Sequence, residues 1–241
     1  MDSRIARLNS MLTEANNIVF FTGAGISTGA GIPDFRSSNG IYNKFPEEKL
    51  SVEYAEKHHD AFLKFLRDNL DTRNAEPALA HKVIAQLQEK KNVTVITQNI
   101  DGLHELAGSR TVYNIHGSFS YSPYCLDCGQ DVPLDILFDE KHICPHCGGT
   151  MPHPDIVLYG EGMRHPDWLD ATVAASRADV LVVVGTSLTV YPAADIPYYF
   201  GEQNWDKLVI INRDSTYFDG DAELVFHEDI QDVFKEIKIY E

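Results

Sequence analysis

The sequence lacks any apolar run long enough to cross a lipid bilayer. Its longest apolar stretches, Ile18 to Phe21 and Val180 to Val184, are only as long as β-strands. Residues 1–9 mix acidic and basic side chains and contain no apolar segment of the kind that a signal peptide needs. We therefore predict that the protein has no contact with a membrane and works in the cytoplasm.

Basic residues are scarce: 20 Lys and Arg stand against 36 Asp and Glu among 241 residues, a formal net charge of −16. A field of this sign repels nucleic-acid phosphates, so we predict no direct nucleic-acid partner. It attracts basic ligands such as lysine-rich peptide segments, although solubility alone also explains it. The 44% of hydrophobic residues suffices for a core and excludes disorder as the main state. We expect the protein to be a monomer.

Cysteine is also rare, and its four copies form two Cys-x-x-Cys pairs, Cys125 with Cys128 and Cys144 with Cys147. Disulfides are not expected in a reducing compartment. The fifteen residues between the pairs match the spacing of a four-thiolate zinc site, whereas a redox pair is the weaker alternative. Four thiolates leave no ligand position open, so we predict a zinc ion with a structural role.

The residues around these pairs fit a metal knuckle. Gly129 and Gly148 follow the two pairs, where the backbone must turn sharply and glycine tolerates positive φ. His142 and His146 flank the second pair, and we interpret both as surface residues because the cysteines already complete a tetrahedron. A zinc ribbon that binds nucleic acid is the competing function, which the net charge opposes.

Helical and strand-like segments alternate along the rest of the chain. The strands are apolar throughout, which is typical of a parallel sheet covered by helices on both faces, an α/β fold. Residues 37–75 and 119–157 interrupt the alternation and are interpreted as two inserted pieces. The expected strands are Ile18 to Phe21, Val93 to Thr97, Val180 to Val184 and Leu208 to Ile211; the expected helices are 5–15, Ala78 to Glu89 and Trp168 to Ser176.

A glycine-rich loop follows the first expected strand. Gly23 and Gly25 form a Gly-x-Gly turn at the place where a nucleotide-binding fold has its phosphate loop. The third glycine, Gly29, comes one position late for the dinucleotide fingerprint, so a plain tight turn is an alternative. Downstream come Asp34, Phe35 and Arg36. The acid can bind hydroxyls, the aromatic ring can cover a flat ring, and the guanidinium can pair with phosphate. Alternatively, Asp34 and Arg36 form a local ion pair.

Polar residues also follow the other expected strands, where α/β sheets bind ligands. Asn99 and Asp101 are able to bind a carboxamide or ribose hydroxyls, or to cap the next helix. His116 precedes a glycine and is a candidate base near neutral pH, although most histidines serve structure. Together with Gly185-Thr186-Ser187 and Asn212-Arg213, these segments predict one extended ligand such as a dinucleotide.

In combination these segments resemble the sirtuin family, the Sir2-like NAD-dependent protein deacylases, in its bacterial single-domain form. The resemblance spans about residues 3–236. The matching pieces are Gly23-Ala24-Gly25-Ile26-Ser27, Gly31-Ile32-Pro33-Asp34-Phe35-Arg36, Thr97-Gln98-Asn99-Ile100-Asp101, His116-Gly117, the paired cysteines, Val157 to Glu161, Gly185-Thr186-Ser187 and Ile211-Asn212.

The resemblance implies a Rossmann-like domain made of residues 1–36, 76–118 and 158–241, and a smaller module made of the helical insert 37–75 and the zinc-binding insert 119–157. NAD, the co-substrate, is expected between them. Implied NAD-binding residues are Gly23, Ala24, Gly25, Ser27, Asp34, Phe35 and Arg36 in the first loop, Gln98, Asn99, Ile100 and Asp101 around the nicotinamide, and Gly185, Thr186, Ser187, Asn212, Arg213 and Asp229 toward the phosphates and adenosine.

The family's chemistry implies that nicotinamide leaves, that the acyl-lysine oxygen attacks the ribose, and that His116 acts as the general base, with Asn99 as a second catalytic residue. The products are free lysine, nicotinamide and O-acyl-ADP-ribose. The substrate peptide is expected to add as a strand between residues 157–161 and 187–191. The implied peptide-binding residues are Val157, Tyr159, Gly160, Glu161, Leu188 and Val190.

Some positions depart from the family. His153-Pro154 replaces a frequent Arg-Pro, and Tyr159 stands where Phe is common. The Tyr-x-x-Arg pattern of family members that remove succinyl or malonyl groups is absent, and Leu63 and Leu66 offer an apolar face instead, so we expect a neutral acyl group, acetyl or longer. A mono-ADP-ribosyltransferase that uses the same NAD site and a non-catalytic binding module are the alternatives.

Overall fold

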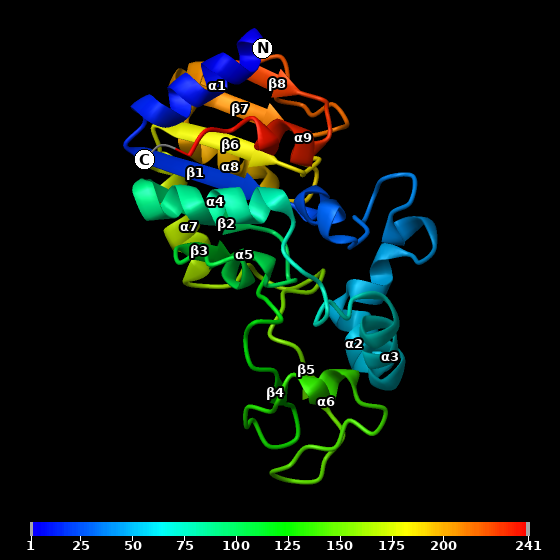
Figure 1. The fold of residues 1–241 in the computed structure, drawn as a ribbon. Helices are drawn as coiled ribbons and strands as arrows, with labels where there is room; N and C mark the ends of the chain where they lie inside the picture. The colour runs from blue at the N-terminus through cyan, green and yellow to red at the C-terminus, as the bar shows by residue number, and fades with distance from the viewer. Residues whose placement is uncertain (1, 240–241) are drawn as a thin grey trace.

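A six-stranded sheet dominates the part of the chain that the computed structural model describes, residues 2–239 (Figure 1). All strands are parallel, in the order β3-β2-β1-β6-β7-β8. This is the Rossmann order, in which the chain changes direction between its first strand, β1, and its fourth, β6. The strands are β1 (Asn17–Thr22), β2 (Asn92–Thr97), β3 (Val112–Asn114), β6 (Val180–Val184), β7 (Leu208–Ile211) and β8 (Leu224–Phe226).

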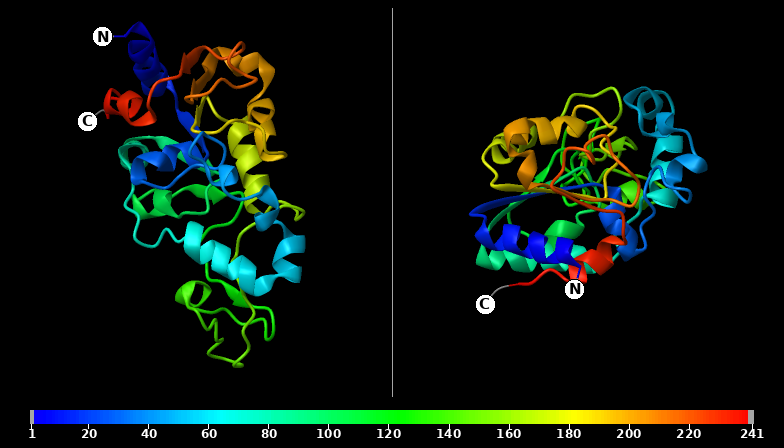
Figure 2. Two further views of the ribbon diagram at one scale, coloured as in Figure 1. Left: turned by 90° about the vertical axis from the view of Figure 1, so that its right-hand side faces the viewer. Right: turned by 90° about the horizontal axis from the view of Figure 1, so that it is seen from above.

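Helices cover both faces of this sheet, which Figure 2 shows edge-on in its right-hand view. Successive strand residues point to opposite faces: Val182 packs into one core and Val183 into the other. The first core lies under α1 (Ser3–Glu14), α4 (Leu79–Lys90) and α9 (Ile230–Lys235), and the second under α7 (Asp167–Ser176) and α8 (Ile196–Phe200).

The expected α/β class is thus confirmed, and the expected strands and helices match to within one or two residues. The short strands β3 and β8 were not predicted, because three residues are too few to give a periodicity signal. A further short helix, α5 (Leu103–Leu106), follows β2. No helix among residues 2–239 has the length and apolar character needed to cross a membrane.

The two inserted segments lie together beyond one end of the sheet (Figure 1). They share one core, in which Phe62, Leu63 and Leu66 from the first insert pack with Phe119 and Phe138 from the second. This shared core supports our division of the chain into a sheet domain and one small module, whose boundaries stay a prediction. The inserts contain α2 (Val52–Lys57), α3 (His59–Asn69), α6 (Asp135–Phe138), β4 (Tyr124–Cys125) and β5 (Pro152–His153).

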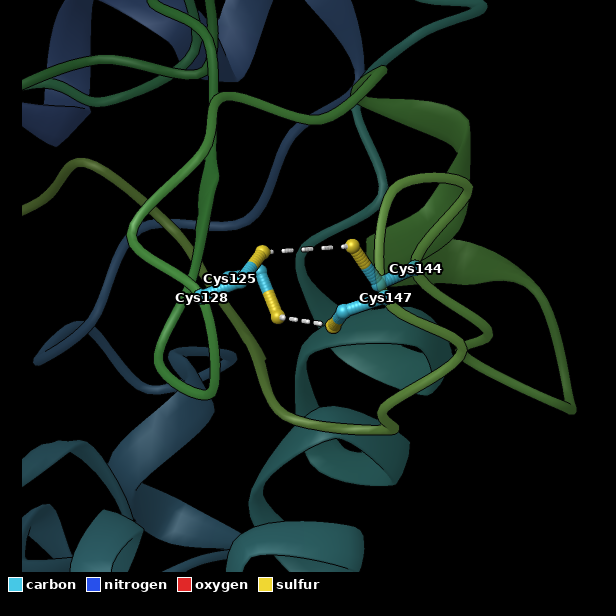
Figure 3. Close-up of side chains that lie close together, drawn as sticks. All are labelled: Cys125, Cys128, Cys144 and Cys147. Carbon is cyan, nitrogen blue, oxygen red and sulfur yellow. Dashed lines mark hydrogen bonds between the residues drawn. The ribbon is translucent and has the colours of Figure 1, made fainter.

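The four cysteines converge in the second insert (Figure 3). The sulfur atoms of Cys125 and Cys147 are 3.8 Å apart, as are those of Cys128 and Cys144, and all four lie within 4.8 Å of one another. A disulfide would need about 2.05 Å. Four thiolates at about 2.3 Å from a tetrahedral zinc are separated by about 3.8 Å. The sulfur positions therefore fit the predicted zinc ion.

The surroundings of the cysteines bear out one expectation and overturn another. Gly129 and Gly148 have φ of 71° and 76°, in the left-handed region expected for the knuckles. His146 is exposed, as predicted, but His142 is buried and its Nδ1 lies 3.0 Å from the Ile136 carbonyl oxygen. The interpretation of His142 as a surface residue was wrong, because the imidazole packs inside the insert, where the Ile136 carbonyl satisfies its ring nitrogen in place of water.

We expect one zinc ion per chain, and we expect Cys144→Ser to abolish stoichiometric zinc binding and to lower the thermal stability of the protein. In a structural site the metal-binding free energy contributes directly to folding. Elemental analysis and thermal unfolding measure both effects. His146→Ala is the matched control, because this side chain lies in the same knuckle without being a ligand. Full zinc occupancy in Cys144→Ser would contradict the assignment.

Candidate functional site

A cavity of about 280 Å³ opens at the carboxyl ends of the sheet strands, against the small module. Of the residues predicted to act in catalysis or to bind NAD or the peptide, all except Ser27, Asp101 and Leu188 line it. The lining residues thus come from the first glycine loop, the ends of β2, β6 and β7, His116, and the strand-like segment Val157 to Glu161. Segments far apart in sequence meet here, as the strand ends of a Rossmann sheet must.

Two glycine-containing loops touch at the point where the strand order reverses. The Gly25 N–H donates to the Gly185 carbonyl at 2.8 Å, and the Gly23 N–H donates to Val184 at 3.0 Å. A Cβ on Gly25 would lie 2.7 Å from the Gly185 Cα, and Gly185 itself has a φ of 64°. Larger residues cannot be accommodated without displacing backbone, so both glycines are needed for this contact.

Asn99 and Asp101 meet Ser27 beneath the glycine loop. The buried Asn99 amide nitrogen donates to the Gly23 carbonyl at 3.2 Å and to Ser27 Oγ at 3.1 Å, and Ser27 Oγ donates to Asp101 at 2.7 Å. The other Asp101 oxygen accepts the Leu103 N–H, so the helix-capping alternative holds for Asp101 as well. Burial raises the pKa of Asp101, against the effect of these two hydrogen bonds. Asp101 and Ser27 therefore fix Asn99 from behind the cavity wall.

Two buried histidines extend this polar layer away from the cavity. His81 on α4 lies with Nε2 3.5 Å from Ser27 Oγ, and its ring contacts that of His104 on α5. His104 Nε2 lies 2.9 Å from the Thr22 hydroxyl at the end of β1. Burial lowers the pKa of His81 to about 4 and that of His104 well below its usual value, so both rings are neutral at physiological pH.

His116 lies at the cavity wall after β3. Its Nδ1 is 3.0 Å from the Gln98 carbonyl oxygen. Because a carbonyl oxygen only accepts, Nδ1 carries the proton, and in the neutral ring Nε2 keeps its lone pair. Burial lowers the pKa of His116 and outweighs the Gln98 hydrogen bond, which raises it. The ring is thus held in the tautomer and charge state of a proton acceptor.

The far end of the cavity is polar. Asn212, predicted for the adenosine half, is nearly buried and donates to the Asp214 carbonyl at 2.7 Å. Arg213 is 70% exposed and lies 3.6 Å from the Asp229 carboxylate, which caps α9. Asp214 and Glu228, which the sequence did not indicate, also line this end, and the Glu228 carboxylate is paired with Arg4. Such a set can accept hydrogen bonds from ribose hydroxyls and place a cation near phosphates.

The predicted peptide-binding segment Val157 to Glu161 forms one edge of the cavity mouth. The Val157 N–H donates to the His116 carbonyl at 2.8 Å, which ties the segment to the candidate base. The Glu161 carboxylate accepts the Leu158 N–H at 2.7 Å and so shapes the turn at Gly160, where φ is 98°. Glu161 thus already has a partner within the chain.

The opposite edge of the mouth follows β6. Val190, Tyr191 and Pro192 line the cavity, whereas Leu188 is buried beneath them with a φ of 55°. A branched side chain rarely adopts this conformation. The Leu188 N–H donates to the Thr186 hydroxyl at 3.3 Å, and the Gln98 amide donates to the same oxygen at 2.9 Å. Leu188 therefore packs into the second core of the sheet domain and does not line the cavity.

The segment Asp34–Arg36 does not form the local ion pair that was an alternative. The Asp34 carboxylate accepts the Ser37 N–H at 2.8 Å, and the Arg36 guanidinium lies 3.0 Å from Glu47. Phe35 contacts Tyr42, whose ring also lies below the Arg36 guanidinium. Tyr42 lines the cavity and was missed, although an aromatic residue six positions after Arg36 was visible in the sequence.

Comparison with known proteins identifies the family of this chain. The Sir2 family model matches residues 23–192. A Clostridium acetobutylicum protein named NAD-dependent protein deacetylase is 41% identical over 243 residues, covering 97% of this chain and 98% of the relative. A Sir2 structure with a deacetylated p53 peptide and 3′-O-acetyl ADP-ribose superposes with a TM-score of 0.89 at 34% identity, covering 96% of each chain.

A second structure, of a Sir2 protein bound to a propionylated peptide, has a TM-score of 0.84 at 33% identity and covers 98% of this chain and 96% of its own. The match therefore extends over both the sheet and the small module. The chain belongs to the Sir2 family.

Proposed function

We propose that the chain is an NAD-dependent protein-lysine deacylase, which transfers an acyl group from lysine to ADP-ribose and releases nicotinamide and O-acyl-ADP-ribose. The observation that carries the proposal is the position of His116. Its ring lies where the glycine loops and the Val157 to Glu161 segment meet, with Nδ1 held by Gln98. The names of the relatives, NAD-dependent protein deacetylases, support the same activity.

The residues of the cavity fit NAD. The Gly25–Gly185 contact lets a pyrophosphate approach backbone, Arg36 and Arg213 supply positive charge, and Asp214, Glu228 and Asp229 offer acceptors for ribose hydroxyls. When bound, NAD supplies a ribose carbon that becomes electrophilic as its bond to nicotinamide breaks. Asn99, Ile100 and Asp101 form the predicted nicotinamide pocket, with Asn99 held by two hydrogen bonds and Asp101 behind it.

His116 performs the proton transfer. Its Nε2 lone pair takes the proton of a ribose hydroxyl, and the Gln98 carbonyl stabilises the charge that then develops on the ring. The neighbouring Val157 to Glu161 segment brings the acyl-lysine to the same point, since its Val157 amide is bonded to the His116 backbone. Peptide addition between this segment and Ser187 to Tyr191 would fix the lysine by backbone pairing.

The proposed acyl group is neutral. Leu63 and Leu66, which were expected to offer the apolar face, are fully buried in the core of the small module and do not line the cavity. The apolar side chains that line the cavity on this side include Leu50, Ile156 and Leu158. An acyl carboxylate there would lose its hydration without gaining a partner. The Sir2 structure with a propionylated peptide is a precedent for a neutral acyl chain.

Mass spectrometry of an acetyl-lysine peptide tests the function. We expect NAD-dependent loss of the acetyl group and formation of O-acetyl-ADP-ribose, with the rate reduced about 10²- to 10⁴-fold in His116→Ala. The exposed His58 provides the control variant His58→Ala, which should keep the wild-type rate. ADP-ribose that stays attached to protein would instead favour the mono-ADP-ribosyltransferase alternative.

The pH profile tests the state of His116. A histidine whose pKa is lowered in the folded protein stays neutral, and active as a base, through its usual pKa of about 6.5, and becomes protonated only at lower pH. We therefore expect the acid limb of kcat/KM to have its midpoint below pH 6.5. A midpoint clearly above that value would show that the ring is not held in the neutral form.

Competition between acyl groups tests the proposal that the acyl group is neutral. On otherwise identical peptides, we expect kcat/KM to be at least about tenfold higher for acetyl-lysine than for succinyl-lysine, equivalent to about 1.4 kcal/mol. Propionyl-lysine serves as the control, since it adds length without charge. A preference for succinyl-lysine would refute the assignment of the acyl group.

A further inference from the structure

The Tyr159 hydroxyl joins two segments that both line the cavity. It accepts a hydrogen bond from the Arg36 guanidinium at 3.3 Å and lies 3.1 Å from the Tyr42 hydroxyl. Arg36 and Tyr42 belong to the loop of residues 34–44, which we call the 34–44 loop, whereas Tyr159 lies in the centre of the proposed peptide-binding segment. One phenol oxygen therefore connects the NAD side of the cavity with the peptide side.

The backbone of Tyr159 is anchored on the small module. Its N–H donates to the Leu50 carbonyl at 2.9 Å, and its carbonyl accepts the Val52 N–H at 3.0 Å. Its ring is half-buried and packs into the core of that module. The position of the phenol is consequently set by the peptide-binding segment and the helical insert.

The 34–44 loop is shaped mainly by its own backbone. The Ile41 N–H donates to Asp34 at 2.9 Å, and the Tyr42 N–H donates to Phe35 at 3.0 Å. These bonds set the conformation of the loop but do not attach it to the peptide-binding segment. Side chains make that attachment: Ile41 and Tyr42 pack in the same core as Tyr159. Arg36 and Tyr42 add polar contacts to the Tyr159 hydroxyl.

The chemistry of the three groups suits a stable link. Burial, followed by the contact with Tyr159, raises the pKa of Tyr42, so its hydroxyl stays protonated. The Arg36 guanidinium also lies over the Tyr42 ring, 5.3 Å from its centroid, and is held from its outer side by Glu47. A phenylalanine at position 159 would keep the ring packing and lose both contacts of the hydroxyl.

We propose that Tyr159 is a positioning residue that couples occupancy of the peptide groove to the placement of Arg36 and Tyr42 of the 34–44 loop at the nucleotide site. The inference rests on the proposed function and deepens it. A peptide that pairs with Val157 to Glu161 fixes the phenol, and the phenol in turn holds Arg36 and Tyr42 in the arrangement that a bound nucleotide meets. Since such coupling is reciprocal, nucleotide binding also favours the peptide.

Titration calorimetry with ADP-ribose, which has no nicotinamide to lose, tests the coupling in the full-length protein. Its Kd is measured with and without saturating acetyl-lysine peptide. We expect the peptide to tighten ADP-ribose binding in the wild type, and Tyr159→Phe to reduce this enhancement about three- to tenfold, the range for a partly exposed hydrogen bond to a charged group. Tyr124→Phe is the matched control, because Tyr124 is another partly buried tyrosine, and its ring packs on His153.

Hydrogen exchange of the ligand-free protein supplies a second readout. We expect faster exchange at the Ile41 and Tyr42 amides in Tyr159→Phe than in the wild type or in Tyr124→Phe. An enhancement and an exchange rate both equal to those of the wild type would overturn the inference. Absence of ADP-ribose binding to the wild-type protein would contradict the proposed function itself, so the two failures are distinguishable.

Discussion

The close contact between the glycine loops after β1 and β6 is the constraint on which the site depends. The two strands are neighbours in the sheet, and their following loops diverge to opposite faces, which opens a crevice at their ends. Gly25 and Gly185 let these loops touch through backbone atoms alone. Without side chains at this contact, the crevice floor consists of peptide groups, which suit a pyrophosphate better than any apolar wall.

Hydrogen bonds with residues around this contact fix the orientation of Asn99 and His116, the two proposed catalytic residues. Asn99 is fixed by Gly23 and Ser27, Ser27 by Asp101, and His116 by the Gln98 carbonyl. Of these partners, Ser27 and Asp101 lie behind the cavity wall, whereas Gly23 and Gln98 line the cavity and act through their backbone carbonyl oxygens. Such support keeps the reacting side chains in one conformation before the ligand arrives, which reduces the reorganisation needed during the reaction.

The sequence predicted the features that are local. The cysteine pairs, the long apolar strands and the polar residues at their ends were all recognisable, because metal spacing, strand periodicity and strand-end chemistry involve neighbours in sequence. It did not show the short strands β3 and β8, the burial of His142, or the link between Tyr42 and Tyr159. These depend on tertiary packing between segments far apart in the chain, for which a single sequence carries no signal.

The affinity of Gly25→Ala for NAD is the measurement that tests the account most directly. The added methyl group would lie 2.7 Å from the Gly185 Cα and push the two loops apart, so NAD should bind at least about tenfold more weakly while the circular dichroism spectrum stays that of the folded protein. Gly220→Ala, where a Cβ meets no atom within 4 Å, should bind like the wild type. Wild-type NAD affinity in Gly25→Ala would contradict the claim that this contact forms the nucleotide site.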